Sequence, residues 1–233
     1  MTGHFDGAFA THVLARADTL LAVPDGMDLR TAALAEPLAV ALHAITRSEV
    51  APGAEVLVMG AGPIGALAVA ALIARGHAVT VCEPAVTRKA LARDLGATVV
   101  EPDDLPEFNM AQVDTLAEVA FPVVIETSGK RRAIEAGFQQ LDRGGRLVMV
   151  GTGIDPPSFD PNRTIVLELS VCGSFVYDDD GFARALELLA TDDFPVDALI
   201  DPAEFGLDGV STAAAGLAAG THAGKVMIVP NRR

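Results

Sequence analysis

The sequence predicts an α/β protein built on a doubly wound parallel sheet, and three observations support this prediction. From residue 55 onward, apolar strand-like runs alternate with helix-like runs at the spacing of parallel βαβ units. The strand-like runs are continuous in Val, Ile and Leu, which is typical of strands covered by helices on both faces. The first run leads directly into Gly60-Ala-Gly-Pro-Ile-Gly65, a glycine-rich turn that an apolar helix follows at once.

The elements are predicted in order along the chain. Residues 7–24 are expected to form two short extended segments, and residues 30–47 one or two helical pieces interrupted at Pro37. Pro156-Pro157 marks an excursion at the edge of the sheet that runs to Val166. The predicted strands are 55–59, 78–82, 97–100, 122–126, 146–151, 166–176 and 225–229. The predicted helices are 63–75, 86–95, 112–119, 130–141, 180–190 and 208–219.

Composition and charge exclude several classes of protein. The 233 residues are 50% hydrophobic, which is enough for a full core, and the net charge of −14 argues against nucleic-acid binding. The most apolar window, Val56–Ala74, contains the glycine turn and Pro63, so a buried strand and helix are expected rather than a membrane span. The N-terminus has no basic region and no apolar signal core, and Cys82 and Cys172 do not suggest a disulfide framework. A cytoplasmic protein is therefore expected.

The glycine turn has the Gly-x-Gly-x-x-Gly spacing that holds the pyrophosphate of a dinucleotide on a helix N-terminus. Gly60 permits the tight turn, Gly62 lets the backbone approach the phosphates, and Gly65 allows close packing of helix and strand. Glu83 lies at the end of the next strand, where its carboxylate would accept ribose hydroxyls and repel a 2′-phosphate. The pattern predicts NAD as the cofactor, although glycines that merely serve a turn would give the same spacing.

Further cofactor contacts are expected where neighbouring strands end, because ligands of a doubly wound sheet lie across the carboxyl ends of its strands. These ends read Glu126-Thr-Ser-Gly, Val150-Gly-Thr-Gly and Gly173-Ser-Phe, and each could equally be a turn required after any strand. Arg88 stands close enough to weaken the preference for NAD over NADP, or is a solvated helix charge. The predicted cofactor-binding residues are Gly60, Gly62, Pro63, Ile64, Gly65, Glu83, Arg88, Thr127, Val150, Gly151 and Ser174.

Together these motifs resemble the carboxy-terminal two-thirds of a zinc-type medium-chain dehydrogenase/reductase, in the sorbitol and threonine dehydrogenase branch. The matching stretches span nearly the whole chain: Gly7–Ala10, Leu20–Pro24, Ala35–His43, Val56–Gly65, Glu126–Gly129, Gly144–Gly151, Gly173–Phe175 and Gly224–Val226. The resemblance implies a Rossmann dinucleotide-binding domain at residues 49–200. It implies a small remnant of a GroES-like β domain with a connecting helix at 1–48, and a C-terminal helix and strand at 201–233 that pack on the remnant.

The family transfers hydride between NAD(P) and an alcohol carbon, with a catalytic zinc that polarises the alcohol oxygen. The chain departs from the family here, because the GroES-like domain that supplies a zinc-binding Cys and a His-Glu pair is not present. Glu36 matches the position of a further metal ligand, but a catalytic zinc needs three protein ligands. No metal site is therefore expected.

Three interpretations of the function stay open. The first is an NAD-linked oxidoreductase without zinc that acts on an alcohol or ketone, with Glu36, His43 and Thr127 as candidate catalytic residues and Glu36 or His43 as the base. The second is a non-catalytic NAD-binding subunit, or one half of a split dehydrogenase that a separate GroES-like subunit completes. The third is that Met1 is not the true start and that the zinc ligands lie upstream.

The resemblance also implies how the chain associates. Relatives pair their subunits through the segment that corresponds to Pro156–Val166, so a homodimer is expected. The final strand, 225–229, returns to the GroES-like domain in relatives, and here it is expected to pair with residues 7–24. An edge left open by this pairing would need cover from the partner subunit.

Overall fold

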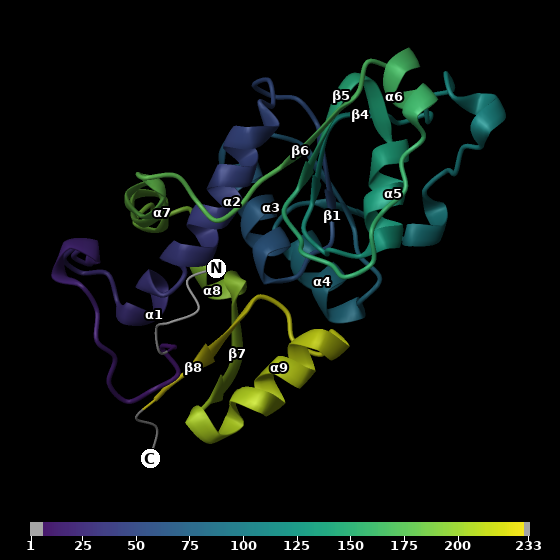
Figure 1. Cartoon of the computed structure of the whole chain (residues 1–233). Coiled ribbons are helices and arrows are strands. Elements are labelled where there is room, and N and C mark those ends of the chain that lie inside the picture. Colours follow the sequence, from purple (N-terminus) through teal and green to yellow (C-terminus); the bar gives the residue numbers. More distant parts are fainter. Residues whose placement is uncertain (1–6, 231–233) are drawn as a thin grey trace.

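A computed structural model describes residues 7–230 of the chain. Its main feature is a six-stranded sheet in the order β3-β2-β1-β4-β5-β6, in which every pairing is parallel (Figure 1). The strands are β1 (Val56–Met59), β2 (Val79–Cys82), β3 (Thr98–Val100), β4 (Phe121–Glu126), β5 (Leu141–Met149) and β6 (Ser170–Gly173). This order confirms the doubly wound Rossmann-like sheet, and it places the reversal of winding between β1 and β4.

Helices connect the strands and also precede them. The α-helices are α1 (Leu29–Ala32), α2 (Ala35–Ser48), α3 (Pro63–Ala74), α4 (Val86–Asp94), α5 (Arg131–Gln139), α6 (Pro161–Val166), α7 (Gly181–Leu189), α8 (Val196–Leu199) and α9 (Val210–Ala219). Short 3-10 turns lie at Ala17–Thr19, Pro102–Asp104, Met110–Gln112 and Leu207–Gly209. None of the helices in the described part of the chain has the length and apolar character needed to cross a membrane.

The two faces of the sheet are buried in separate apolar clusters. Along β1, Val56 and Val58 belong to the cluster with α2, α3, α4 and α7, whereas Leu57 and Met59 belong to the cluster with α5. This alternation follows from the two-residue period of a strand, and burial on both faces explains why the strands are continuously apolar. The helices therefore lie on either side of the sheet, as Figure 1 shows.

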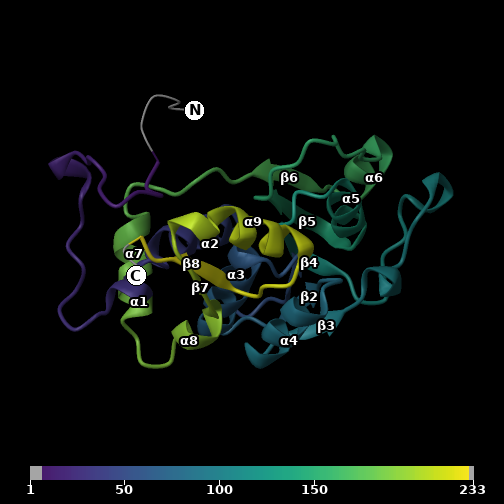
Figure 2. The ribbon, with the colours of Figure 1, turned by 90° about the horizontal axis from the view of Figure 1, so that it is seen from below.

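The C-terminal residues form a separate small unit, which we call the C-terminal unit: β7 (Ile200–Phe205), α9 and β8 (Lys225–Ile228). The strands β7 and β8 pair with each other in parallel, and Figures 1 and 2 show the unit outside the two helix layers of the large sheet. The expected pairing of the final strand with residues 7–24 is wrong, because β8 takes β7 as its neighbour. The strand β7 was not predicted, because its Asp201, Pro202 and Glu204 break the apolar pattern.

The N-terminal segment also differs from its prediction. Residues 7–24 contain a 3-10 turn and no paired strand, although the backbone at Arg16 and Leu20 is extended. Residues 29–48 form two helices, which agrees with the prediction of one or two helical pieces. The break between them falls before Ala35 rather than at the predicted Pro37. Pro37 lies in the first turn of α2, where its missing N–H would have no partner in the helix.

Two further predicted elements are wrong or too long. The helix expected at 112–119 is absent apart from the 3-10 turn, because the buried Arg163 guanidinium takes the carbonyls of Gln112, Val113 and Thr115.

The strand expected at 166–176 is only β6, and the predicted excursion before it ends in α6. Asp160 caps α6 and Pro161 occupies its first position, which is a favourable start for a helix. The strand β5 begins five residues before the predicted 146.

Candidate functional site

The glycine turn between β1 and α3 is held by close backbone contacts. Gly60 has φ of +95°, a conformation that favours glycine, and the Thr127 hydroxyl donates to the carbonyls of Met59 and Gly60 at 3.2 and 3.0 Å. A Cβ on Gly65 would collide with the Gly60 carbonyl and lie 2.7 Å from Thr127 Oγ1. Gly60 and Gly65 therefore serve the turn and the contact between helix and strand, as the pattern predicts.

Gly62 differs from its two neighbours because it faces open space. Its backbone is extended with φ of −64°, and the nearest atom to an added Cβ would be Arg88 Nη1 at 3.9 Å. No side chain caps α3, and Pro63 occupies its first position, so Ile64 and Gly65 supply the first N–H groups of the helix. The turn thus offers backbone donors beside a cradle that any side chain would fill, which fits a phosphate group.

The Glu83 carboxylate lies beneath this turn and is buried. Its Oε2 accepts the N–H of Ala61 at 2.7 Å, and its Oε1 accepts the N–H of Ala85 at 2.8 Å. Glu83 therefore fastens the turn after β1 to the turn after β2, a role beyond the predicted contact with ribose. Each carboxylate oxygen keeps a lone pair for a further donor.

Arg88, in the first turn of α4, connects the glycine turn to the C-terminal unit. Its Nε donates to the carbonyl of His222 at 3.3 Å, and its Nη2 donates to the carbonyl of Leu217 near the end of α9. The neighbouring Thr87 hydroxyl donates to the Gly220 carbonyl at 2.7 Å. Arg88 is thus no freely solvated helix charge, and its remaining Nη1 is the atom that faces Gly62.

The turns after β4 and β5 pack backbone against backbone. A Cβ added to Gly151 or Gly153 would collide with Gly129, and the N–H groups of Val150 and Gly151 donate to the Glu126 carbonyl at 2.8 and 3.0 Å. In the structure Val150 and Gly151 thus support this floor at the carboxyl ends of the strands. Whether they also contact a cofactor stays a prediction.

Glu126 organises that floor with its side chain, and the sequence analysis did not single out this role. The carboxylate is fully buried and accepts the N–H groups of Ser128 and Gly129 at 2.7 and 3.0 Å, together with the Ser128 hydroxyl. Burial raises the pKa of Glu126 above its ordinary value, and these hydrogen bonds offset part of the rise. The sequence signal was an acidic residue at the end of an apolar strand, followed directly by small residues.

Ser174 follows β6 at the same edge of the sheet. Its N–H donates to the Met149 carbonyl at 2.9 Å, whereas its buried Oγ has no hydrogen-bond partner among the described residues. A buried hydroxyl without a partner is costly, so this atom is suited to meet a polar group of a ligand.

The three candidate catalytic residues lie in different surroundings. Thr127 supports the glycine turn through its hydroxyl, and Glu36 is exposed in the first turn of α2. His43 lies two turns further along α2, with Nδ1 at 3.6 Å from Asp178 Oδ2. Both His43 Nδ1 and Asp178 Oδ1 are buried and make no hydrogen bond with a described residue. No hydrogen bond or ion pair in the described part of the chain joins Glu36, His43 and Thr127 to one another, so their catalytic roles stay predictions.

A catalytic zinc does not fit the donors that this structure brings together. Within residues 7–230 no group of three or more His, Cys, Asp and Glu side chains has a metal-binding arrangement. Glu36 is exposed on α2, and burial raises the pKa of the Cys82 thiol to about 11, which disfavours the thiolate that a metal requires.

Comparison with known proteins gives a consistent picture. The family model for zinc-binding dehydrogenases matches residues 63–191. The chain is 37% identical over 185 residues to a 2-dehydro-3-deoxy-L-galactonate 5-dehydrogenase of Pseudoalteromonas atlantica, which covers 79% of this chain and 54% of that protein. It is 33% identical over 199 residues to the sorbitol dehydrogenase of Bacillus subtilis, with 80% of this chain and 53% of that protein covered.

Among solved structures, a Sinorhizobium meliloti protein with bound NADP is similar, with a TM-score of 0.73 and 27% identity. That match covers 89% of this chain and 61% of the other. The chain spans about half the length of the curated relatives it matches.

Proposed function

Because the chain belongs to the zinc-binding dehydrogenase family, we propose that it binds a nicotinamide dinucleotide and takes part in the oxidation of an alcohol or the reduction of a ketone. The observation that supports the proposal best is the open cradle at Gly62, which lies at the β1–β4 reversal beside the free N–H groups of α3. The relatives named above act on small polyols or sugar acids, which supports a substrate of this chemical class.

We propose NAD as the preferred cofactor. Glu83 is an acid at the end of β2, and a carboxylate there would accept the ribose hydroxyls and repel a 2′-phosphate. Arg88 gives two of its donor nitrogens to the C-terminal unit, and its remaining Nη1 faces the pyrophosphate cradle rather than a 2′-phosphate. The preference for NAD over NADP rests on these two residues.

A nicotinamide dinucleotide held at the glycine turn would supply the hydride acceptor for alcohol oxidation and the hydride donor for ketone reduction. The residues of this chain must then hold the cofactor and take the proton of the alcohol hydroxyl. We propose that Glu36 or His43 takes this proton, and that Asp178 orients the His43 imidazole. Glu126, Gly129 and Gly151 hold together the turns at the carboxyl ends of β4 and β5, the edge of the sheet where the cofactor would lie.

The substitution Gly62→Val tests the cofactor site. An extended backbone with φ of −64° accepts valine, so the fold should be kept, but the side chain would fill the phosphate cradle. Titration calorimetry with NAD, NADH and NADP should show binding to the parent protein and a loss of at least about tenfold in affinity for the variant.

The matched control is Gly7→Val, which also adds a side chain into open space but lies far from the turn in the sequence. It should bind NAD like the parent protein. Equal NAD binding by Gly62→Val and Gly7→Val, with both folded by circular dichroism, would contradict the proposed site.

The base and the role of zinc need a separate experiment. We propose that the described residues do not assemble a zinc site by themselves, so chelators should leave NAD-dependent alcohol oxidation unchanged. If Glu36 is the base, Glu36→Gln should abolish that oxidation while NAD binding persists, because the amide cannot take a proton, whereas oxidation that survives would leave His43 as the base. Activity that a chelator removes and zinc restores would overturn this part of the proposal.

A second candidate function is one half of a split dehydrogenase, and one specific observation favours it. Residues 7–24 bury no side chain and expose large apolar ones, with Phe9 67% exposed and Leu14 fully exposed. Such a segment is suited to be covered by a GroES-like domain on a separate subunit. NAD binding without alcohol turnover, and turnover restored by a co-expressed GroES-like protein, would favour this function over the first.

We also propose that the chain forms a homodimer through the edge of β6. The strand β6 has β5 as its only neighbour in the described sheet, and Val171 and Phe175 beside it are exposed. The Ser174 N–H points to β5, and the N–H groups of successive residues in a strand point to opposite sides. The N–H groups of Val171 and Gly173 therefore point outward, where a second copy could pair with them. The cytoplasmic location stays a prediction from the sequence.

A further inference from the structure

The connection from β6 to α7 contains a short segment, residues 174–178, which we call the strap. Figures 1 and 2 show this connection passing α2 on its way from the edge of the sheet to α7. The strap begins at Ser174, whose N–H is fixed to the Met149 carbonyl, and ends at Asp178, whose carbonyl accepts the N–H of Gly181 at 3.0 Å. Among the described residues, no hydrogen bond holds the backbone between these two anchors.

The backbone of the strap is strained at Val176. Its φ of +49° lies in the left-handed region, which a β-branched residue occupies rarely and at a cost. Two other non-glycine residues of the described chain have positive φ, Glu49 and Glu168, and neither is β-branched. Val176 is 45% exposed, so its side chain offers little packing to hold the strained conformation.

Polar atoms without a partner gather at the two ends of the strap. The described residues contain four buried side-chain nitrogen or oxygen atoms that make no hydrogen bond. Three of the four lie here: Ser174 Oγ, Asp178 Oδ1 and the Nδ1 of His43. The His43 Nδ1 is 3.6 Å from Asp178 Oδ2, which is too far for a hydrogen bond. Each unmet polar atom costs free energy, so another conformation of the strap would satisfy its polar groups better.

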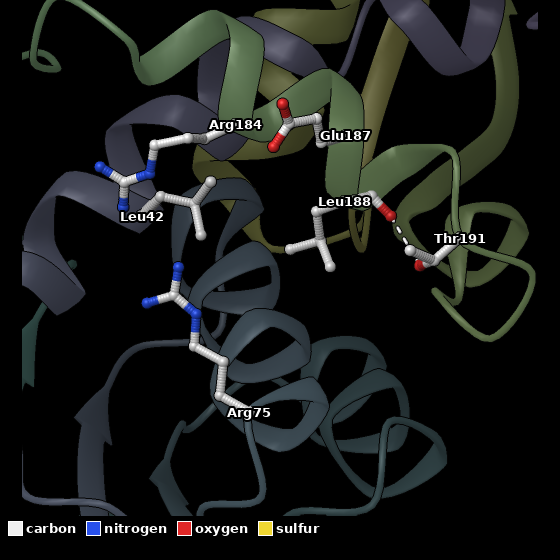
Figure 3. Close-up of a pocket in the computed structure, with 6 residues that line it drawn as sticks. All are labelled: Leu42, Arg75, Arg184, Glu187, Leu188 and Thr191. Atoms are coloured by element: carbon white, nitrogen blue, oxygen red, sulfur yellow. Dashed lines mark hydrogen bonds between the residues drawn. The ribbon is translucent and has the colours of Figure 1, made fainter.

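Arg184 of α7 holds the far end of the strap beside α2. It donates to Asp178 Oδ2 at 3.2 Å and to the Thr46 hydroxyl at 3.2 Å. Figure 3 shows its side chain extending from α7 toward Leu42, which precedes His43 in α2. Asp178 is therefore kept close to His43, and a shift of less than about 1 Å would bring the two side chains into hydrogen-bonding distance.

The near end of the strap lies at the candidate cofactor site. Ser174 follows β6 at the carboxyl edge of the sheet, where the cofactor is proposed to lie, yet its Oγ is enclosed by protein. A polar group of a ligand can reach an enclosed hydroxyl only if the chain around it moves. The strain at Val176, two residues further on, favours such a movement.

We propose that the strap has two conformations, the strained one described here and a relaxed one that a bound dinucleotide selects. In the relaxed conformation Ser174 Oγ meets a polar group of the cofactor, and Val176 leaves the left-handed region. At the same time the His43 Nδ1–H donates to Asp178. The strap thus links occupation of the cofactor site to the placement of the candidate base, and this role rests on the proposed cofactor site.

The chain carries its own probe of the strap, because Tyr177 is its single tyrosine. The Tyr177 ring packs edge-on against Phe182 with 5.0 Å between the ring centroids, so a movement of the strap changes its surroundings. The full-length protein is produced with 3-fluorotyrosine, and its ¹⁹F NMR signal is recorded during a titration with NAD. A shifted signal should grow in proportion to the NAD that calorimetry shows to be bound.

Val176→Gly removes the strain from the described conformation, because glycine accepts a positive φ. The relaxed conformation then becomes less populated, so the apparent dissociation constant for NAD should rise about fivefold. The matched control is Glu168→Gly, which relieves strain at φ of +56° outside the strap. It should bind NAD like the parent protein.

Ser174→Ala removes the hydroxyl that the cofactor engages, so it should bind NAD without the shifted ¹⁹F signal. Long-range ¹H–¹⁵N spectra of the parent protein should show a proton fixed on His43 Nδ1 in the NAD complex, and Ser174→Ala should lack this feature. The loss of the signal in His43→Gln assigns it.

The outcomes separate the strap from the cofactor site. NAD binding in calorimetry with an unchanged ¹⁹F signal would overturn the strap and leave the cofactor site standing. Equal NAD affinities for Val176→Gly and Glu168→Gly, with both folded by circular dichroism, would also overturn the strap. A parent protein that binds no NAD would overturn the cofactor site, and the strap with it.

Discussion

Two buried glutamates hold the turns of the candidate site by accepting backbone N–H groups. Glu83 takes the N–H of Ala61 in the glycine turn, and Glu126 takes those of Ser128 and Gly129 after β4. Burial raises the pKa of the Glu126 carboxyl group. At the scale of single residues, the site is therefore built on acids that serve the backbone.

The raised pKa of Glu126 makes the stability of the protein depend on pH. A carboxyl group with a raised pKa in the folded state stabilises the fold below its unfolded pKa, and this contribution is lost as pH rises through the folded value. The loss should appear above the ordinary value of 4.5, so we expect Glu126→Gln to gain stability relative to the parent protein between pH 5 and about 8. A tenfold change in the acid dissociation constant on folding corresponds to about 1.4 kcal/mol in the free energy of unfolding. Urea denaturation across this pH range measures the difference in the free energy of unfolding between Glu126→Gln and the parent protein.

Glu135→Gln is the control for this prediction. The N–H of Ser158 and the Arg131 guanidinium lower the pKa of Glu135, so its titration ends below the range that is measured. Its stability should differ from that of the parent protein by a constant amount from pH 5 to 8. A constant difference for Glu126→Gln as well would show that its carboxyl group does not titrate in this range.

The sequence identified the residues of the glycine turn correctly, but it could not show what their neighbours do. Gly60, Gly62 and Gly65 have the predicted conformations and surroundings, because the spacing of the motif encodes a local turn. The link between Arg88 and the carbonyls of Leu217 and His222 joins residues more than 125 positions apart, and no local pattern encodes such a contact.

At the scale of elements, α4 holds the C-terminal end of α9. Arg88 and Thr87 donate to the carbonyls of Leu217, Gly220 and His222, which lie in or just after the last turn of α9. A cation at this end also interacts favourably with the helix dipole. Only Ala213 of α9 is buried, so these polar contacts carry much of the attachment of α9, whereas β7 contributes Ile200 to the main apolar cluster.

Arg88→Gln should therefore loosen the C-terminal unit without unfolding the large sheet. Hydrogen bonds from a charged group contribute about 1.5–3 kcal/mol to stability, and their loss should lower the free energy of local opening in β7, α9 and β8. Amide exchange in these elements should therefore become at least about tenfold faster in protein free of cofactor. Hydrogen exchange with mass spectrometry measures this, and Arg93→Gln on the same helix should leave the pattern unchanged. Faster exchange spread evenly over β1 to β6 would show that Arg88 acts on the whole fold.

Strands and helices that bury apolar faces were predicted well, whereas elements fixed by distant polar contacts were not. The order of β1, β2 and β4 with their helices follows from continuous apolar runs between turns. In the segment 112–119, where a helix was predicted, the Arg163 guanidinium donates to the carbonyls of Gln112 and Thr115, a contact from 48 or more positions away that no local pattern encodes. The short α6 and β7 carry little apolar pattern, so only their turn and cap residues could have indicated them.

At the scale of the whole molecule, the family resemblance inferred from the motifs is confirmed by the match to the zinc-binding dehydrogenases. The chain matches about half the length of its curated relatives. Its described part exposes large apolar residues in several places, and two of these are residues 7–24 and the stretch at β6. The proposed GroES-like partner subunit would cover the first of these, and the proposed second copy of the chain would cover the second.

The proposed homodimer gives a direct prediction. Light scattering at micromolar concentration should give about twice the chain mass of 24.1 kDa for the parent protein. Val171→Lys should shift the protein toward the monomer, because a lysine on an exposed edge strand disfavours pairing. Val119→Lys, at an exposed valine away from β6, should remain a dimer. A parent protein that is monomeric at this concentration would refute the dimer.

The packed turns after β4 and β5 have a consequence for protein engineering. Gly129 is enclosed by the backbone of Thr152, while Gly151 and Gly153 leave no room for a side chain beside Gly129. Neither loop can be redesigned or randomised alone, because each uses the bare backbone of the other as its wall. An exchange of these loops would have to transplant residues 126–129 and 150–153 together as a single cassette.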